Sequence, residues 1–471
     1  MSPEDGFKDR IPVKSKVAYG SANTASSILS GIGLSAITFF YNVKLGLSAE
    51  LIGIGWLIFS VWNAINDPIF GYIQDRTKSK LGRRIPYLRY GAPVYGILFI
   101  IIWFPIVDVN DKIALFFYFE LMLFAFDTIF TIIGLITYAL PAEMALSSKE
   151  RASLMVYSTL LGGIGYIVTF LFPVMLLTGD KTTEISPDFL VTMIFLGVIC
   201  AVVIFISSYF LKENTFTQLE ESLGIVDAVK ETFKNKPFLI NEVSVFTLLI
   251  SSTTLTTAIF YYVDYVLKLS GFMTIVPLLL IFLMVFVFAY IYGTKIIPKY
   301  GLKKVNIFGL IFSGLSFILL FLIGWNFDSA IPSFLLIGIG LSALMITAPI
   351  IFADTVDYDE TRTGKRRETT YSGIEALITK PAISIANWLF LLAIDSFGFQ
   401  PNSAIQTDSA IFGIMLGFTI IPAVFVLFGA LVMKFYPLDG PKWEAQKLEL
   451  QKIHEQKEKE YLEYLKKQEK L

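Results

Sequence analysis

Of the 471 residues of this chain, 55% are hydrophobic and 16% are charged, whereas a soluble domain carries about 25% charged residues. This composition predicts a protein embedded in the lipid bilayer, and the formal net charge of -1 gives no basic field that would attract nucleic acid. Cys200 is the single cysteine and His454 the single histidine, which excludes an intrachain disulfide and leaves no basis for histidine catalysis or a His/Cys metal cluster. We therefore expect no enzyme, no catalytic residue, no metal and no cofactor.

Apolar windows of about 20 residues, the length that crosses about 30 Å of hydrocarbon, predict an all-α membrane protein with twelve transmembrane helices in two six-helix bundles. The expected spans are residues 17–42, 49–74, 89–108, 113–142, 152–178, 188–211, 238–267, 272–297, 302–324, 330–356, 370–397 and 409–436. The charged segment 1–16 lacks the apolar core and cleavage site of a secretory signal, so we expect the first span to be retained.

Lysine and arginine set the expected orientation. If both termini are cytoplasmic, nearly all of the 38 Lys and Arg face the cytoplasm, and Lys380 lies within a span. The exceptions are Lys44, Lys112, Lys181 and Lys268. This asymmetry follows the positive-inside rule and predicts a multi-pass protein of the plasma membrane with both termini inside, which we expect to function as a monomer.

A polar connector divides the spans evenly. The expected parts are an N-terminal six-helix bundle, a cytoplasmic connector, a C-terminal six-helix bundle and a charged cytoplasmic tail, at residues 1–211, 212–237, 238–436 and 437–471. Apolar residues at helical spacing in the connector predict an amphipathic helix with a scaffold role. The tail is predicted to be a solvated helix without a role in transport.

The second span holds a carboxylate, Asp67, within an apolar run. An unpaired charge at mid-bilayer costs about 2.5–3.5 kcal/mol, so an intramembrane Asp marks a functional site by default. The turn after this span, Gly71 to Arg84, has a weak echo after the eighth span, from Gly293 to Lys304. Six plus six spans with a similar glycine-and-base turn indicate a duplicated transporter fold with its binding site near mid-membrane, between the halves.

The turn after the second span carries a recognisable pattern: Gly71, Asp75, Arg76, Gly82 and Arg83. This pattern resembles the signature loop of the major facilitator superfamily. We expect such a loop to brace the second span against a neighbouring span in one state of a transport cycle.

Longer strings narrow the resemblance. Residues 67–88, residues 353–368, and Tyr138 and Pro141 followed by Glu150 resemble the glycoside-pentoside-hexuronide:cation symporters, the melibiose permease family. The resemblance implies a cation-coupled transporter with a sugar site and a cation site, and it names positions for both.

The cation positions implied by this resemblance fall at Ser27, Asn63, Asp67 and Gly134, so a single carboxylate is present. Asn63 and Asp67 are spaced i,i+4 and share one helix face. Asp127 lies two helical turns from Gly134 on the same stripe, and we expect it either to replace a missing carboxylate or to be a packing or outer-vestibule residue.

For the solute, the family's sugar-contacting arginine falls at Thr159, whereas its lysine of the eleventh span is matched by Lys380. Tyr138 is the aromatic residue that we expect to contact solute. Glu242, Asp264 and Glu375 lie nearer the span ends, where interface exposure or pairing is expected.

A further pair of acids, Asp354 and Asp357, is expected to have a structural role with Arg366 and Arg367.

These observations favour a cation-coupled symporter of a small polar solute, a sugar or glycoside, that works by alternating access. We expect the coupling cation to be H⁺ in preference to Na⁺, because a lone buried Asp carries a proton more readily than it cages a hydrated ion. With the site empty, Asp67 is expected to pair with Lys380. A lipid or lysolipid carrier of the same fold, indicated by a cavity with apolar walls and one charged end, and a nontransporting membrane receptor are the alternatives.

Overall fold

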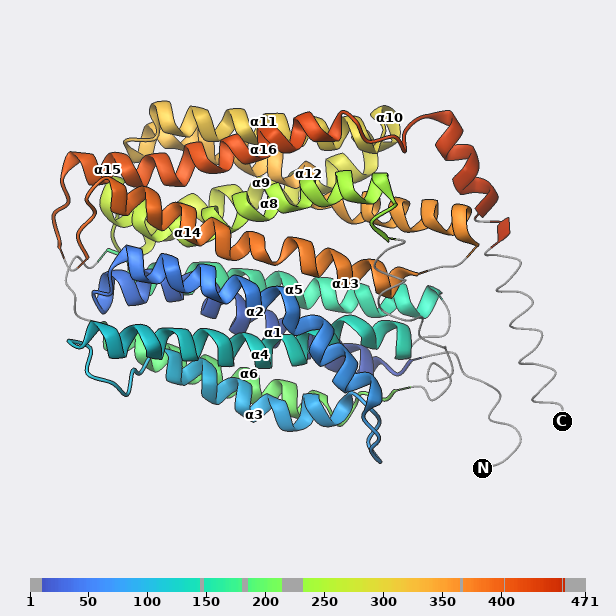
Figure 1. Cartoon of the computed structure of the whole chain (residues 1–471), viewed down its shortest axis with the longest axis horizontal. Helices are drawn as coiled ribbons and strands as arrows, with labels where there is room; N and C mark the ends of the chain where they lie inside the picture. Colours follow the sequence, from blue (N-terminus) through green and yellow to red (C-terminus); the bar gives the residue numbers. More distant parts are fainter. Residues whose placement is uncertain are drawn as a thin grey trace.

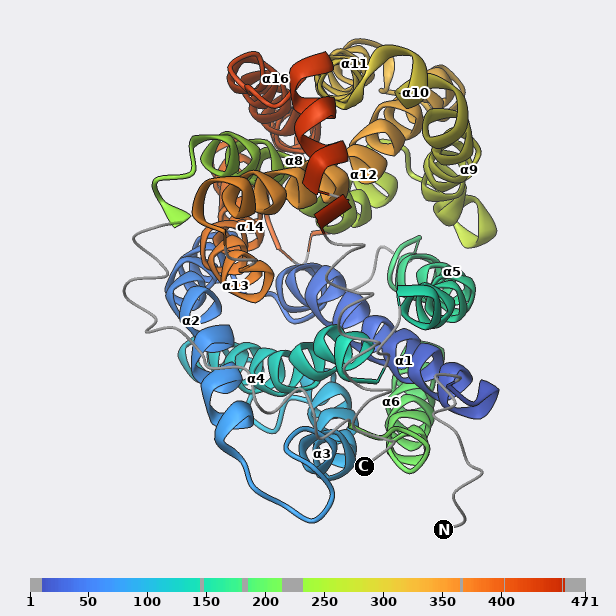
Figure 2. The ribbon, with the colours of Figure 1, turned by 90° about the vertical axis from the view of Figure 1, so that its right-hand side faces the viewer.

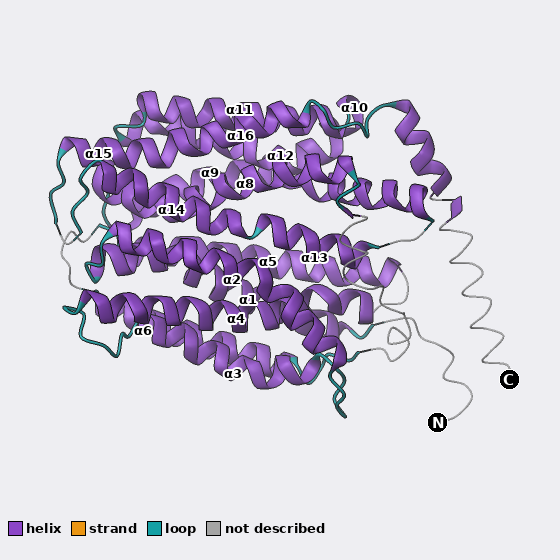
Figure 3. Ribbon diagram, in the orientation of Figure 1, coloured by secondary structure: helices purple, strands orange, loops and turns teal. Residues whose placement is uncertain are grey.

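The computed structural model describes residues 11–144, 148–179, 185–213, 232–364, 367–401, 403–450 and 452–453. Every regular element in this part of the chain is a helix (Figure 3). Within these described residues, twelve helices are long and apolar enough to cross a membrane, which agrees with the predicted number of spans. Most of the predicted connector, and the tail beyond residue 453, including His454, lie outside the described residues.

The six spans of the first half are α1 (Val13–Phe39, continued by a π-helical turn at Phe40–Lys44), α2 (Ala49–Arg76), α3 (Ile85–Ile102), α4 (Lys112–Met144), α5 (Ser148–Leu177) and α6 (Pro187–Ser207).

In the second half, several spans are built from shorter helices. The seventh span is α8 (Lys236–Tyr261) with a π-helical turn at Tyr262–Val266, and the eighth runs from a 3-10 turn (Gly271–Ile275) through α9 (Val276–Ile291) and a π-helical turn (Tyr292–Ile296) to α10 (Ile297–Tyr300). The ninth and tenth spans are the single helices α11 (Leu302–Ile323) and α12 (Phe327–Thr363). The eleventh consists of α13 (Glu368–Thr379) and α14 (Pro381–Ser396), and the twelfth of α15 (Asp408–Met415), a π-helical turn (Leu416–Ile420) and α16 (Ile421–Met433).

The two halves repeat the same helix pairings. In the first, α3 packs on α4 and α6 while α1 packs on α5 and α6; in the second, α11 packs on α12 and α16 while α8 packs on α14 and α16. The halves form two layers in Figure 1, and they meet where α2 packs on α14 and α1 on α8 (Figure 2). A site between the halves is therefore bordered by α1, α2, α8 and the eleventh span.

We call the end with α15 the far end and the end with the turn 77–84 the loop end; they lie at the left and right of Figure 1. At the far end, polar contacts join the halves. Thr38 Oγ1 donates to Asn387 Oδ1 over 3.0 Å, and Tyr261 Oη donates to Asn42 Oδ1 over 3.0 Å. The backbone N–H of Gly179 donates to Asp264 Oδ1 over 3.0 Å. All except Gly179 are at most 1% exposed, so the far end is closed.

Aromatic packing completes this closure. The ring of Phe39 lies 5.4 Å from that of Phe260 and 5.0 Å from that of Tyr261. The neighbouring π-helical turns at Phe40–Lys44 and Tyr262–Val266 occupy corresponding positions in the two halves. Because π-turns insert one residue into a helix and re-aim its side chains, they occur often at functional positions.

At the loop end, Glu213 holds the turn between α2 and α3. Its carboxylate accepts the backbone N–H groups of Arg83, Arg84 and Ile85 over 2.8, 2.7 and 2.7 Å. A carboxylate on these free N–H groups caps the N-terminus of α3 and interacts favourably with its dipole. Gly82 has φ +105°, and a Cβ there would lie 2.7 Å from the Glu213 carboxylate, so this position requires glycine.

The described start of the tail differs from the expectation of a solvated helix. Residues 441–450 are helical, and Trp443, 5% exposed, donates its Nε1–H to Asp354 Oδ2 over 3.1 Å. Lys447 Nζ forms an ion pair with Asp354 Oδ1 at 2.6 Å. The partners of Asp354 are thus in the tail, and Arg367 pairs instead with Asp359 at 2.6 Å, where both residues are buried. Lys365 and Arg366 lie outside the described residues.

Candidate transport site

An ion pair crosses the interface between the halves near the middle of the spans. Lys380 Nζ lies 2.5 Å from Asp67 Oδ1, and the two side chains are 19% and 14% exposed. Asp67 comes from α2 and Lys380 from the eleventh span, so the sequence separation is 313 residues. A paired charge in the membrane interior avoids the cost of an isolated one, which explains how both residues are accommodated.

The backbone positions the lysine at a break in its span. Lys380 separates α13 from α14, and the following residue, Pro381, has no N–H to donate to the preceding turn. Asn63 Nδ2 donates to the Lys380 carbonyl over 3.4 Å, and the Asn63 side chain is buried. Asn63 and Asp67 therefore both face the eleventh span.

Three further polar groups complete the cluster. Lys380 Nζ also donates to Asn66 Oδ1 and to Thr131 Oγ1 of α4, each over 3.3 Å. The Asn66 amide in turn donates to Asp127 Oδ2, and Asp127 is 1% exposed. Asp127 is thus a buried member of this cluster rather than a vestibule residue. Two acids and one base give the cluster a net charge of minus one when all are ionised.

Asn66 and Thr131 were not predicted from the sequence, although a signal for each was present. Asn66 is spaced i,i+3 from Asn63, and Thr131 is spaced i,i+4 from Asp127, so each shares a helix face with a residue already singled out. Both were overlooked because the resemblance marks other positions.

Two predicted residues form no hydrogen bond or ion pair with the described residues of the cluster. Ser27 is exposed on α1, and its carbonyl accepts the hydroxyl of Ser30 over 3.3 Å. Thr159 is exposed on α5. No contact between described residues joins either side chain to Asp67 or Lys380. At Gly134 a Cβ would be in van der Waals contact with Phe130, at 3.7 Å, so the position has room for a small side chain.

The residues of the signature loop lie at the loop end of α2. Gly71 has open space where a Cβ would stand, and the Arg76 guanidinium lies 4.1 Å from the ring centroid of Tyr72. Gly82 and Arg83 form the turn held by Glu213. The side chain of Asp75 lies outside the described residues.

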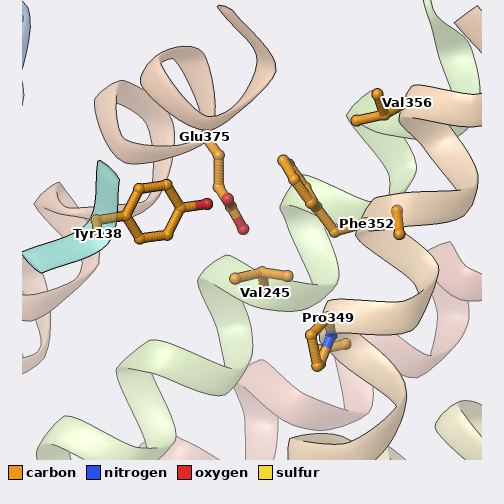
Figure 4. Close-up of a pocket in the computed structure, with 8 residues that line it drawn as sticks. Tyr138, Val245, Pro349, Phe352, Val356 and Glu375 are labelled. Carbon is orange, nitrogen blue, oxygen red and sulfur yellow. The ribbon is translucent and has the colours of Figure 1, made fainter. Parts of the chain in front are cut away.

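A cavity of about 400 Å³ lies between the halves, towards the loop end. Its lining residues are Tyr138, Val245, Ala348, Pro349, Phe352, Ala353, Val356 and Glu375. Figure 4 shows the carboxylate of Glu375 and the phenol of Tyr138 directed into the space between α4 and the second half. The hydroxyls of Tyr138 and Ser372 lie 3.1 Å apart. The cavity thus has apolar walls, two aromatic residues and one carboxylate.

Two paired six-helix halves, an ion pair across their interface and a central cavity define the class: a membrane transporter of the major facilitator type, not an enzyme. The family is shown by a match over residues 18–440 to the model described as "MFS/sugar transport protein", and the chain belongs to that family. It is a multi-pass membrane protein that carries a small-molecule solute by cation-coupled symport.

Individual proteins resemble this chain over nearly its whole length. The "Uncharacterized symporter YnaJ" of Bacillus subtilis is 27% identical, covering 97% of each chain. The "Isoprimeverose transporter" of Lactiplantibacillus pentosus is 22% identical, covering 92% of this chain and 90% of that protein. The crystal structure of a D-xylose-proton symporter has a TM-score of 0.68 at 15% identity, covering 91% of this chain and 98% of that one, and shows the same fold.

Proposed function

We propose that this protein is a proton-coupled glycoside symporter in which Asp67 and Asp127 bind the coupling proton and Lys380 is their counter-charge. The observation that carries the proposal is the Asp67–Lys380 ion pair across the interface between the halves. A pair of this kind links the charge state of the site to the contact between α2 and the eleventh span, which is what coupling by alternating access requires.

The contacts of Lys380 favour H⁺ over Na⁺ as the coupling ion. Its ammonium group donates hydrogen bonds to the side-chain oxygens of Asp67, Asn66 and Thr131. These oxygens are the hard ligands that Na⁺ would need. A proton needs one carboxylate oxygen only. Protonation of the cluster neutralises its excess negative charge, and transfer of the proton to Asp67 releases Lys380 towards the solute.

The orientation follows from the distribution of basic residues. We infer that the loop end is cytoplasmic, because most Lys and Arg lie on that side. The closed far end then faces outward, and the structure is an inward-facing state in the plasma membrane. One chain supplies both sides of the cluster and of the cavity, which supports a functional monomer.

The signature loop is the segment to which we assign a role in the conformational change. Gly71, Asp75, Arg76, Gly82 and Arg83 lie at the cytoplasmic end of α2, and Glu213 fixes the turn to the segment after α6. We infer that the loop moves with its own half and braces α2 against a neighbouring span in one state of the cycle. Ser27, Asn63, Thr159 and Tyr138 remain candidates for ion or solute contact in other states.

The cavity supports a glycoside as solute. Tyr138 and Phe352 offer aromatic surfaces, and the Glu375 carboxylate is an acceptor for sugar hydroxyls. Relatives named for isoprimeverose and D-xylose transport make these two sugars suitable first probes.

The apolar walls of the cavity also favour a second candidate, a carrier of lysolipids or other amphipaths. Thermal-shift measurements with isoprimeverose, an alkyl glycoside and a lysolipid separate the two candidates. Stabilisation by the lysolipid alone would favour the second.

The deciding experiment is uptake of isoprimeverose and D-xylose into proteoliposomes under an imposed pH gradient or an imposed Na⁺ gradient. We expect uphill accumulation with the pH gradient, whereas Asp67→Asn should retain solute exchange and lose accumulation. Asp408→Asn, which changes an exposed acid at the far end, is the matched control and should behave like the unmodified protein. Accumulation driven by Na⁺ and indifferent to pH would refute the proposal.

A further inference from the structure

A second acid, on α8, is buried without a counter-charge. Glu242 is 1% exposed, and its Oε1 accepts a hydrogen bond from Asn241 Nδ2 over 3.4 Å. Its Oε2 is buried and has no hydrogen-bond partner among the described residues. The expectation of interface exposure or pairing is therefore wrong for Glu242.

Glu375 is the neighbouring acid and opens onto the cavity. It lies on α13, which packs on α8, the helix of Glu242. Val245, spaced i,i+3 from Glu242, lines the same cavity, so this face of α8 is turned towards it. Within the described residues, neither acid forms a salt bridge.

Among the described residues, bases of the helices packed on α8 are engaged elsewhere: Lys16 of α1 pairs with Glu150, and Arg362 of α12 pairs with Asp359. Lys380, at the end of α13, is bound to Asp67. Besides Glu375, the titratable group among the described residues that line the cavity is the phenol of Tyr138, and Asp354 of α12 is paired with Lys447. Helix α16 contains no charged residue, and the only one in α14, Asp395, is at the far end. The pair therefore needs a cation from outside the protein.

We propose that Glu242 and Glu375 form a second cation site, in which the two carboxyl groups share one proton beside the solute cavity. The proton enters from cavity water, binds one carboxylate oxygen, and leaves again as the same proton to water. Two nearby carboxylates cannot both stay ionised in a low-dielectric site, and one shared proton removes one of the charges. A Na⁺ ion would require more oxygens than this pair and its amide neighbour supply.

This inference rests on the proposed proton-coupled symport, and it deepens it, because it implies a second proton per solute. At equilibrium under a gradient of about one pH unit and no membrane potential, two coupled protons give about 100-fold accumulation and one gives about 10-fold. Glu242→Gln should therefore lower accumulation about 10-fold and leave solute exchange intact.

Infrared difference spectroscopy of the purified protein during a pH titration tests the site without any solute. The carboxylic acid band of the shared proton should be present in the unmodified protein and lost in both Glu242→Gln and Glu375→Gln. It should persist in Asp67→Asn, so failure of the Asp67 proposal is distinguishable. Asp408→Asn, which changes an exposed acid at the far end, is the control and should keep the band.

Two results of the infrared titration would contradict the proposal. A band unchanged in both Glu242→Gln and Glu375→Gln, or lost in only one of them, would overturn the shared proton. Melting temperatures close to that of the unmodified protein identify variants that are folded. Glu375→Gln changes a residue at the cavity wall, so it provides a folded test if Glu242→Gln destabilises the second half.

Discussion

The buried acids of the two halves of the molecule have different partners. Asp67 and Asp127 of the first half share a cluster with Lys380, Asn66 and Thr131. Glu242 of the second half has one amide contact and an acidic neighbour, Glu375. Both clusters lie beside the interface, but among the described residues a base from the opposite half forms an ion pair only with the first.

This difference separates two physical roles. A carboxylate held by an ammonium group stabilises the contact between the halves, and it changes that contact when it is protonated. A carboxyl pair without a base favours the state with one proton bound, and its proton is bound and released beside the solute rather than at the contact between α2 and the eleventh span. The charge state of the first cluster therefore changes the contact between the halves, whereas the second cluster binds its proton next to the solute.

Lys380→Ala is expected to have the largest effect. Removing the base leaves two uncompensated acids, and breaking a buried pair in this way costs about 3 kcal/mol. Thermal unfolding in detergent should show this as a lower melting temperature, with a smaller loss in acid, where protonation neutralises the acids. Solute affinity and coupling should both fall. A decrease in melting temperature of the same size at neutral and acid pH would contradict the role of the ion pair.

A matched pair of isosteric changes sharpens the comparison. Asp67→Asn should cost about 2 kcal/mol, because it leaves the Lys380 ammonium without its charged partner. Glu242→Gln should change stability by less than about 0.5 kcal/mol, because a neutral amide replaces a protonated acid of similar shape. Melting curves of both variants at neutral pH provide the measurement. An equal loss of stability in Asp67→Asn and Glu242→Gln would mean that Glu242 is ionised and paired.

Thr131→Val is expected to have the smallest effect on the first cluster. The change removes one acceptor from Lys380 and retains the shape of the side chain, so it should cost about 1 kcal/mol. Uptake assays should show weaker coupling with unchanged solute affinity. Coupling as tight as in the unmodified protein would show that Asp67 alone positions the lysine.

Part of this architecture is readable from the sequence. Hydropathy over about 20 residues is a local property, and it predicted all twelve spans. Asp67 and Lys380 stood out because charges in apolar runs are costly. The signature loop was recognised by its resemblance to the major facilitator pattern, and the structure shows that Gly82 of this loop has a positive φ.

The partners of these charges were decided by the tertiary structure. Lys380 meets Asp67 across 313 residues and Thr131 across 249, and hydropathy carries no information about such distances. Helical periodicity gives a residue its face but not the helix opposite that face. The same limit applies to Asp354, which pairs with Lys447 of the tail. The sequence by itself thus determined which segments cross the membrane and where charge is embedded, whereas only the packing of the two halves decided which charges are neutralised, because neutralisation depends on distances of a few ångströms between separate helices.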